Sequence, residues 1–295
     1  MKVACSYTEI IYYYHYFCKK FTMKTPPKKR NTKPSFSPKA KTNHGHGKRK
    51  IQITKQKPVD EKIRLNRYIA NAGICSRREA DKFIAAGVVT VNGKVITEMG
   101  YKVLPSDHVR YNGTSLTPEK KVYLLMNKPK DTVTTVRDPH AKKTVIGLIA
   151  GCCKERIVPM GRLDRNTTGV LLLTNDGELI KKLTHPAQEI EKIYVATLEK
   201  NFKSSHFEVL LNGIKLEDGD IAFDALSYID NKEKNKIIIR IHSGRNRIVR
   251  RTLESLEYKV KNLDRINFAG ITKKGLRRGQ WRFLTAKEIG YLKML

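Results

Sequence analysis

The feature that most constrains the fold is the apolar run Val170–Leu173, which lies between two polar segments that each contain glycine. A short apolar run bounded by turn residues is typical of a buried strand. The segment before it, residues 161–169, begins and ends with glycine and holds one carboxylate, Asp164, between Arg162 and Arg165. Cationic neighbours favour the ionised form of a carboxylate, which can attack an electrophile or accept a proton. The pattern therefore predicts a catalytic carboxylate in a loop directly before a core strand.

A helix is expected to follow this strand. Residues 174–177, Thr-Asn-Asp-Gly, lead into a helix through Leu183, and His185-Pro186 ends it. Asp176 is a second carboxylate in this stretch, but Asn and Asp at a strand-to-helix junction ordinarily cap the helix. We therefore interpret Asp176 as a cap and keep Asp164 as the catalytic candidate.

The charge of the chain indicates a polyanionic partner. The formal net charge is +31, and residues 19–57 contain fourteen Lys and Arg but no Asp or Glu. We expect residues 1–61 to form a disordered basic arm. The chain from Pro58 to Leu295 has 44 Lys and Arg against 27 Asp and Glu, so the folded part is basic as well. Because no apolar run reaches the about 18 residues that cross a bilayer, we expect nucleic acid and no membrane.

The first 22 residues are rich in tyrosine and lack the small-residue cleavage site of a signal peptide. We hypothesise that translation starts at Met23, which a mass spectrum with peptides from before Met23 would refute. The five cysteines are odd in number and have no Cys-x-x-Cys spacing, which argues against disulfides and a zinc ribbon. We expect a cytoplasmic protein and assign no metal site.

Residues 62–110 are expected to form a small unit of two helices and a hairpin. The first helix ends at Gly73, and the second begins at the capping box Ser76-Arg77-Arg78-Glu79 and ends at Gly87. Strands 88–91 and 94–96 flank an Asn-Gly pair, which favours a type I′ turn. Residues 111–119 are interpreted as the linker that leaves this unit.

This small unit resembles the S-four-type RNA-binding domain, which is named after a ribosomal protein. In that family the basic side of the helices meets the RNA backbone. The resemblance implies the same use for the exposed basic residues Arg64, Arg67, Arg77, Arg78 and Lys82. An ordinary solvated helix face is the alternative for any one of them.

Residues 120–295 are expected to form a second unit of the α+β class. Strands are predicted at residues 122–128, 192–198 and 237–241, with a short helix near 144–150. Strands that are often adjacent in sequence favour a mixed, mostly antiparallel sheet. The whole fold is thus predicted as a small αα-hairpin domain followed by a larger α+β domain.

A helix over residues 245–257 would carry four arginines in about two turns, with Val249 and Leu253 on its apolar face. By helical spacing, Arg247, Arg250 and Arg251 project away from that face. The group can be a phosphate-binding or solvated face, or one arginine can pair with Asp164. Spacing alone does not decide between these alternatives. Candidate RNA contacts outside the small unit are Arg162, Arg245, Arg247 and Arg251.

Five motifs of the second unit together resemble one family. They are Gly161-Arg162-Leu163-Asp164-x-x-Thr167-x-Gly169, the leucine run with Thr174-Asn175-Asp176-Gly177, Lys192-x-Tyr194, Gly244-Arg245-Asn246-Arg247-x-Val249-Arg250-Arg251, and Gly279-Gln280-Trp281-Arg282. With the amino-terminal domain they resemble the RsuA/RluB family of ribosomal RNA pseudouridine synthases over residues 62–285. Each motif alone is unspecific, and the specificity comes from their order.

The resemblance implies a role for three residues. Asp164 would be the catalytic aspartate, Tyr194 the tyrosine that packs on the target base, and Arg250 the arginine paired with the aspartate. Without this resemblance, Tyr194 would be interpreted as a core residue, because a tyrosine in an apolar strand is usually buried. One position departs from the family: many members have Gln where this chain has Ile248. Because helical spacing turns Ile248 away from Arg250, we expect this change to tune activity and not to abolish it.

The implied reaction runs without a cofactor on a flipped-out uridine, whose uracil leaves the ribose, turns and rejoins it through carbon 5. Large-subunit ribosomal RNA is the expected substrate, and ribosomal RNA or a pre-ribosomal particle the expected partner of a monomer. One alternative is a synthase acting on small-subunit or transfer RNA. Another is a non-catalytic RNA-binding factor in ribosome assembly. A nucleotide enzyme is disfavoured because the sequence has neither a Walker-type loop nor a dinucleotide fingerprint.

Overall fold

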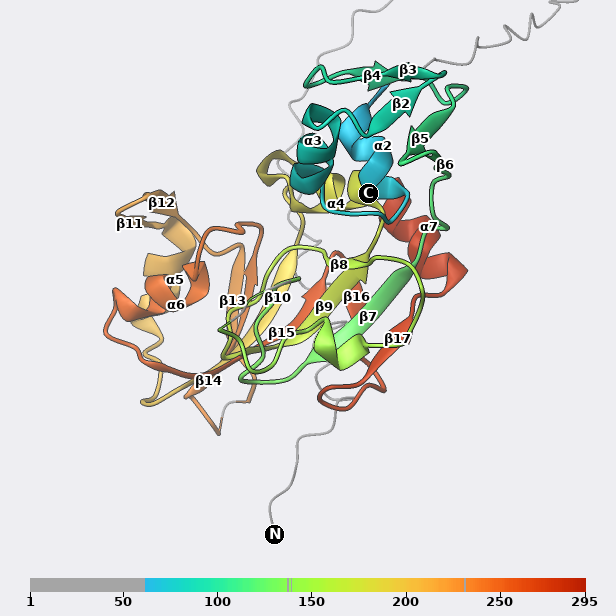
Figure 1. The fold of residues 1–295 in the computed structure, drawn as a ribbon. Coiled ribbons are helices and arrows are strands. Elements are labelled where there is room, and N and C mark those ends of the chain that lie inside the picture. Colours follow the sequence, from blue (N-terminus) through green and yellow to red (C-terminus); the bar gives the residue numbers. More distant parts are fainter. Residues whose placement is uncertain (1–61, 137, 139, 231) are drawn as a thin grey trace, which may run out of the picture. The chain divides into compact units, whose positions relative to one another are not determined.

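The computed structural model describes residues 62–136, 138, 140–230 and 232–295. The expected basic arm and the hypothesised start at Met23 lie outside these residues. The described part has the predicted α+β architecture, with a small four-stranded sheet and a larger nine-stranded sheet (Figure 1).

The small sheet packs with two helices around its own core. Helices α2 (Leu65–Asn71) and α3 (Arg77–Ala85) precede strands β2 (Val89–Val91), β3 (Lys94–Val95), β5 (Val109–Tyr111) and β6 (Thr114–Ser115), in the sheet order β3-β2-β5-β6. A separate pair joins β1 (Ile63–Arg64) to β4 (Lys102–Val103). The predicted capping box at Ser76 is present. Asn92 and Gly93 both have positive φ, as the predicted type I′ turn requires.

Part of the segment expected to be a linker belongs to this sheet. Strand β6 pairs with β5 through residues 114 and 115, and Leu116 is buried in the small core. The reason is a second tight turn at Asn112 and Gly113, which also has positive φ at both residues. Asn-Gly favours a hairpin at both places, although residues 111–119 were predicted to be a linker.

The large sheet has the strand order β13-β14-β10-β15-β9-β7-β17, and β8 and β16 pair with β9 and β15. Its strand pairs are antiparallel except for β9 with β15. The strands are β7 (Tyr123–Lys128), β8 (Val158–Pro159), β9 (Thr167–Thr174), β10 (Lys192–Leu198), β13 (Ala225–Tyr228), β14 (Lys236–Ile241), β15 (Val260–Phe268), β16 (Ile271–Thr272) and β17 (Trp281–Phe283).

Helices and a second hairpin surround this sheet. They are α4 (Gly177–Thr184), α5 (Ser205–Asn212), α6 (Ile248–Glu254), α7 (Ala286–Met294), the short 3-10 helices η1 (Gly147–Ile149) and η2 (Pro186–Gln188), and the hairpin β11 (Ile214–Leu216) with β12 (Gly219–Ile221). The predicted helix near 144–150 is thus only one 3-10 turn. In Figure 1, α5, α6 and the hairpin lie at the β13–β14 end of the sheet, and α7 lies beside β7 and β17.

The two faces of the sheet carry different clusters. Alternate residues of β7 separate them, because Tyr123 and Leu125 join one cluster and Leu124 and Met126 join the other. The first cluster contains residues of α4 and α7. The second contains residues of the 145–163 segment, including Leu163, which directly precedes Asp164. The loop of the candidate carboxylate is therefore anchored in the core on this second face.

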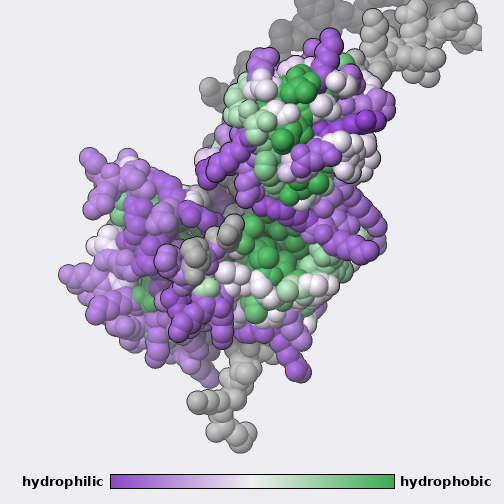
Figure 2. Space-filling model, in the orientation of Figure 1, coloured by the Kyte–Doolittle hydropathy of each residue, from purple (hydrophilic) through white to green (hydrophobic). Residues whose placement is uncertain are grey.

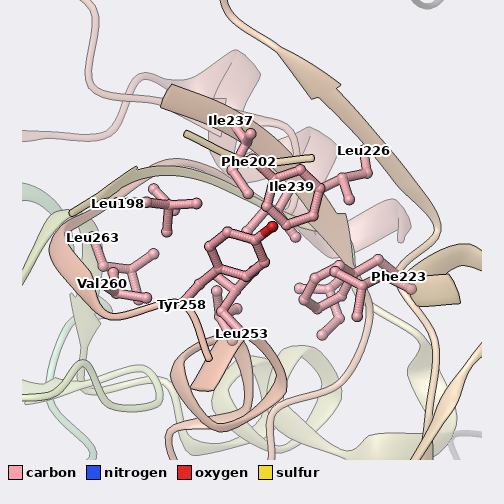
Figure 3. Close-up of a cluster of buried hydrophobic side chains, with 14 of the residues drawn as sticks. Leu198, Phe202, Phe223, Leu226, Ile237, Ile239, Leu253, Tyr258, Val260 and Leu263 are labelled. Carbon is pink, nitrogen blue, oxygen red and sulfur yellow. The ribbon is translucent and has the colours of Figure 1, made fainter. Parts of the chain in front are cut away.

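A third cluster fixes helix α6 at the β13–β14 end of the sheet. Ile248, Val249 and Leu253 of α6 pack with Phe202, Tyr258 and residues of β10, β14 and β15 (Figure 3). The sequence accounts for this packing, because the apolar residues of α6 recur at helical spacing while those of β14 alternate with half-buried residues.

Hydrophilic side chains cover most of the α5–α6 region in the view of Figure 2, and an apolar area lies near the centre of that view. No helix in the described ranges is long and apolar enough to cross a membrane.

Candidate active site

Asp164 lies in a tight turn immediately before β9. The Thr167 backbone N–H donates to the Asp164 carbonyl oxygen at 3.0 Å. The Thr167 hydroxyl donates to the Asp164 Oδ2 atom at 3.4 Å, and 28% of the aspartate side chain is exposed. The carboxylate is therefore partly desolvated but open to a substrate.

The buried side chain of Lys128 fixes the backbone of this turn by hydrogen bonds. Its ammonium group is fully buried at the end of β7 and donates to the carbonyl oxygens of Asp164, Arg165 and Thr167 at 3.1, 3.1 and 2.9 Å, and to that of Pro129 at 3.1 Å. Burial lowers the pKa of Lys128 to about 8, and the Asp164 carboxylate acts in the opposite direction.

Lys128 was not among the predicted site residues. The signal was a lysine that ends the apolar strand, directly after Asn127 and directly before Pro129. A buried ammonium group requires several acceptors, and a turn with unpaired carbonyl groups supplies them.

Arg250 forms an ion pair with the Asp164 carboxylate. The Arg250 Nε atom lies 3.9 Å from Asp164 Oδ2, and Nη1 donates to the Val260 carbonyl oxygen at 2.9 Å. Only 9% of the arginine side chain is exposed. Burial lowers the pKa of Arg250 below its ordinary value, and Asp164 opposes this shift. The buried Nε–H has no hydrogen-bond partner among the described residues.

The helix predicted over 245–257 is shorter in the structure, and the predicted direction of Arg250 is wrong. Helix α6 begins at Ile248, because Arg247 has a left-handed backbone with φ of 46°. Arg250 does not project away from the apolar face but is buried beside Val249 and Leu253. Ile248, the position that departs from the family pattern, packs in the core cluster around Tyr258.

Tyr194 lies in the middle of β10 and contacts two clusters. It packs against the cluster that supports α6 and against the cluster that contains Leu163. Its side chain is half-buried. The ring is thus placed between the element that carries Arg250 and the loop that carries Asp164.

The two arginines next to Asp164 in sequence do not supply its ion pair. Arg165 instead lies 3.6 Å from Asp131, measured from Nε to Oδ1, and Arg162 is exposed. In the described part of the chain, neither of these arginines forms an ion pair with Asp164. The ion pair comes from a residue 86 positions further along the chain.

Two of the predicted RNA-binding arginines are engaged by the β11–β12 hairpin. Arg251 Nη1 donates to Asp218 Oδ2 at 3.0 Å, and Arg245 Nη1 lies 3.3 Å from Asp218 Oδ1. The hydrogen bond from Arg251 holds the pKa of Asp218 below its usual range. Arg247 is exposed and lies 3.8 Å from Glu254. Of the basic residues in the small unit, Arg64, Arg77, Arg78 and Lys82 are exposed and Arg67 is half-buried.

Asp176 is the N-cap of α4, as the sequence indicated. Its Oδ1 atom accepts from the backbone N–H groups of Glu178 and Leu179 at 3.2 and 3.4 Å. Its Oδ2 atom accepts from the Tyr123 hydroxyl at 2.8 Å. These bonds explain the residue without a catalytic role.

Comparisons with known proteins give a consistent result. The family model for RNA pseudouridylate synthase matches residues 122–255, and the S4 domain model matches residues 63–109. Ribosomal large subunit pseudouridine synthase B of Bacillus subtilis is 42% identical over 235 residues, which cover 79% of this chain and 96% of that protein. Dual-specificity RNA pseudouridine synthase RluF of Escherichia coli is 34% identical over 239 residues, which cover 78% of each chain. A crystal structure of a pseudouridylate synthase superposes with a TM-score of 0.57 and 27% identity over 78% of this chain and 99% of that chain.

Proposed function

Because the chain belongs to the RNA pseudouridylate synthase family, we propose that it isomerises a specific uridine of ribosomal RNA to pseudouridine, with Asp164 as the catalytic carboxylate. The family resemblance expected from the five motifs is confirmed. The chain is therefore an RNA-modifying isomerase. We propose which RNA it modifies and what its site residues do.

One observation carries the assignment of Asp164. Its carboxylate is partly exposed, yet it lies 3.9 Å from a buried guanidinium group, and the turn that bears it is tied to a buried lysine. The guanidinium group lies within ion-pair distance of the carboxylate, and the fixed turn keeps the carboxylate in one place. Both properties are needed by a nucleophile or by an acid/base group.

The substrate uridine and the product pseudouridine are isomers with the same atoms. The bond between ribose C1′ and uracil N1 breaks, the uracil rotates, and a bond between C1′ and C5 forms. The hydrogen on C5 leaves as a proton and N1 gains one, so atoms and charges balance. We propose that the target base stacks on the Tyr194 ring once it has left the RNA helix, because a half-buried ring flanked by apolar clusters can receive a planar base.

Asp164→Asn tests the catalytic proposal. We expect loss of pseudouridine formation with little change in RNA affinity, because the amide keeps the shape of the side chain but can neither attack nor accept the proton. Asp131→Asn is the matched control, since it removes an exposed carboxylate from the neighbouring loop. A non-catalytic assembly factor would bind RNA equally well in all three proteins but would form no pseudouridine in any of them. Full modification by the Asp164→Asn variant would refute the role of Asp164.

The identity of the RNA is tested by mapping. The name of the Bacillus subtilis relative refers to the large ribosomal subunit, and that of RluF to dual specificity. We propose large-subunit ribosomal RNA, bound as free RNA or in a pre-ribosomal particle by a monomer in the cytoplasm. Arg64, Arg77, Arg78 and Lys82, with Arg67, are proposed to contact its phosphates. Pseudouridine maps of cells with and without the gene should differ at a large-subunit position, whereas a difference only in small-subunit or transfer RNA would support the alternative substrates.

A further inference from the structure

The carboxylate of Asp164 has no short hydrogen bond to fix it in the described structure. Its two side-chain contacts are the Thr167 hydroxyl at 3.4 Å and Arg250 Nε at 3.9 Å. Both are longer than the usual range for a strong bond to a carboxylate. The position of the carboxylate therefore depends on the backbone that carries it.

One threonine fixes the residue before Asp164. The Thr134 hydroxyl donates to the Leu163 carbonyl oxygen at 2.8 Å, and it accepts from the Leu163 backbone N–H at 3.3 Å. Only 7% of Thr134 and 6% of Leu163 are exposed. A single hydroxyl thus satisfies both backbone polar groups of the residue that leads into the catalytic turn.

The segment that carries Thr134 is itself anchored. The Val133 N–H donates to the Lys143 carbonyl oxygen, and the Val145 N–H donates to the Val133 carbonyl oxygen, each at 3.0 Å. Val145 is buried in the same cluster as Leu163. The hydroxyl of Thr134 is therefore held at a defined place and is not carried by a free loop.

We propose that Thr134 is a positioning residue for Asp164, which it serves through the Leu163 backbone. This inference rests on the proposed role of Asp164. Lys128 holds the turn from residue 164 onward, and Thr134 holds it at residue 163, so the two residues fix the turn on both sides of the Asp164 Cα atom. Loss of the Thr134 hydroxyl removes the support at residue 163, while Lys128, Arg250 and Tyr194 stay in place.

Thr134→Val tests this role, because valine has the shape of threonine but neither donates nor accepts a hydrogen bond. Displacement of a catalytic group by about 1 Å can cost about 100-fold in rate. We expect kcat to fall by about 10- to 100-fold and KM for the RNA to stay within about twofold. Thr134→Ser keeps the hydroxyl and should restore most of kcat. The matched control is Thr132→Val, since Thr132 is 1% exposed in the same segment and its hydroxyl, among the described residues, bonds only to the Lys130 carbonyl oxygen, at 3.3 Å.

Thermal melting of each variant shows whether it is folded at the assay temperature. If Thr134→Val is not folded there, Thr134→Ala takes its place, because alanine removes the hydroxyl without placing a methyl group against the Leu163 backbone, and the same split between kcat and KM is expected. The proposal is overturned if a folded variant without the hydroxyl has the kcat of Thr132→Val, if the loss lies in KM alone, or if Thr134→Ser is as slow as Thr134→Val. An active Asp164→Asn variant would refute the proposed function instead, so the two failures are distinguishable.

Discussion

The pairing of Arg250 with Asp164 predicts a large loss of activity in Arg250→Met. At an effective dielectric constant of about 20, two unit charges 3.9 Å apart attract each other by about 4 kcal/mol. Because 28% of the Asp164 side chain is exposed, solvent reduces this attraction, and about 2 kcal/mol is a reasonable lower value. If this stabilisation is needed at the transition state, kcat falls by about 30- to 1,000-fold.

The release of tritium from carbon 5 of labelled uridine measures this rate directly, because that hydrogen leaves when the new bond forms. Enzyme in excess over RNA isolates the chemical step from product release. Arg250→Lys should lie between the wild type and Arg250→Met, since lysine keeps a charge but cannot both face Asp164 and donate to the Val260 carbonyl oxygen as arginine does. Lys261→Met is the matched control, because that side chain is exposed on β15, next to the Val260 residue that Arg250 contacts.

A rate for Arg250→Met within about threefold of the Lys261→Met rate would refute the reasoning, given that a factor of three corresponds to about 0.65 kcal/mol. Melting temperatures must accompany the rates. A buried charge costs desolvation, so Arg250→Met can be as stable as the wild type while it is far less active.

Two further predictions concern stability. Gly169→Ala should unfold the protein or destabilise it by more than about 3 kcal/mol, because the added Cβ would lie 2.0 Å from the Arg265 carbonyl oxygen at a residue with φ of 110°. The control Gly100→Ala, with φ of 84° and open space around the new Cβ, should cost about 1 kcal/mol. Equal denaturant midpoints for the two variants would contradict the predicted clash. The lowered pKa of Lys128, about 8 against an ordinary 10.5, means that between these two pH values the unfolded chain holds a proton that the folded protein has released. The unfolding free energy of the wild type should therefore rise relative to that of Lys128→Met from pH 8 to 10.5, by up to about 3 kcal/mol, and a difference that is constant with pH in urea unfolding would argue against the buried charge.

Local sequence signals predicted the elements of this fold well. The Ser76 capping box, the Asn92-Gly93 turn and the Asp176 cap each depend on neighbours within a few residues, and the structure contains all three. The buried strand after the Asp164 loop was equally clear, because four apolar residues in a row fit a strand that is covered on both faces.

The parts that were missed depend on contacts between distant segments. The burial of Arg250 follows from its contact with β15, because Arg250 Nη1 donates to the Val260 carbonyl oxygen, and helical spacing does not reveal which strand covers the edge of an apolar stripe. Lys128 and Thr134 act on the turn through bonds to its backbone carbonyl and N–H groups, and such bonds leave no pattern in the side chains of the turn. The family resemblance named Asp164, Tyr194 and Arg250 but not the residues that hold them.

The Asp218 carboxylate on the β11–β12 hairpin affects how steeply the affinity for RNA falls as the salt concentration rises. Each phosphate that a free cation neutralises releases a condensed counterion, and the logarithm of the binding constant falls with the logarithm of salt concentration in proportion to the number released. Arg245 and Arg251 already share a carboxylate, so a phosphate that reached them would displace an internal anion and would gain less from counterion release. If the slope of log binding constant against log salt concentration is predicted from the number of basic residues near α6, the predicted slope will therefore be too steep. The Asp218→Asn variant should have a steeper measured slope than the wild type.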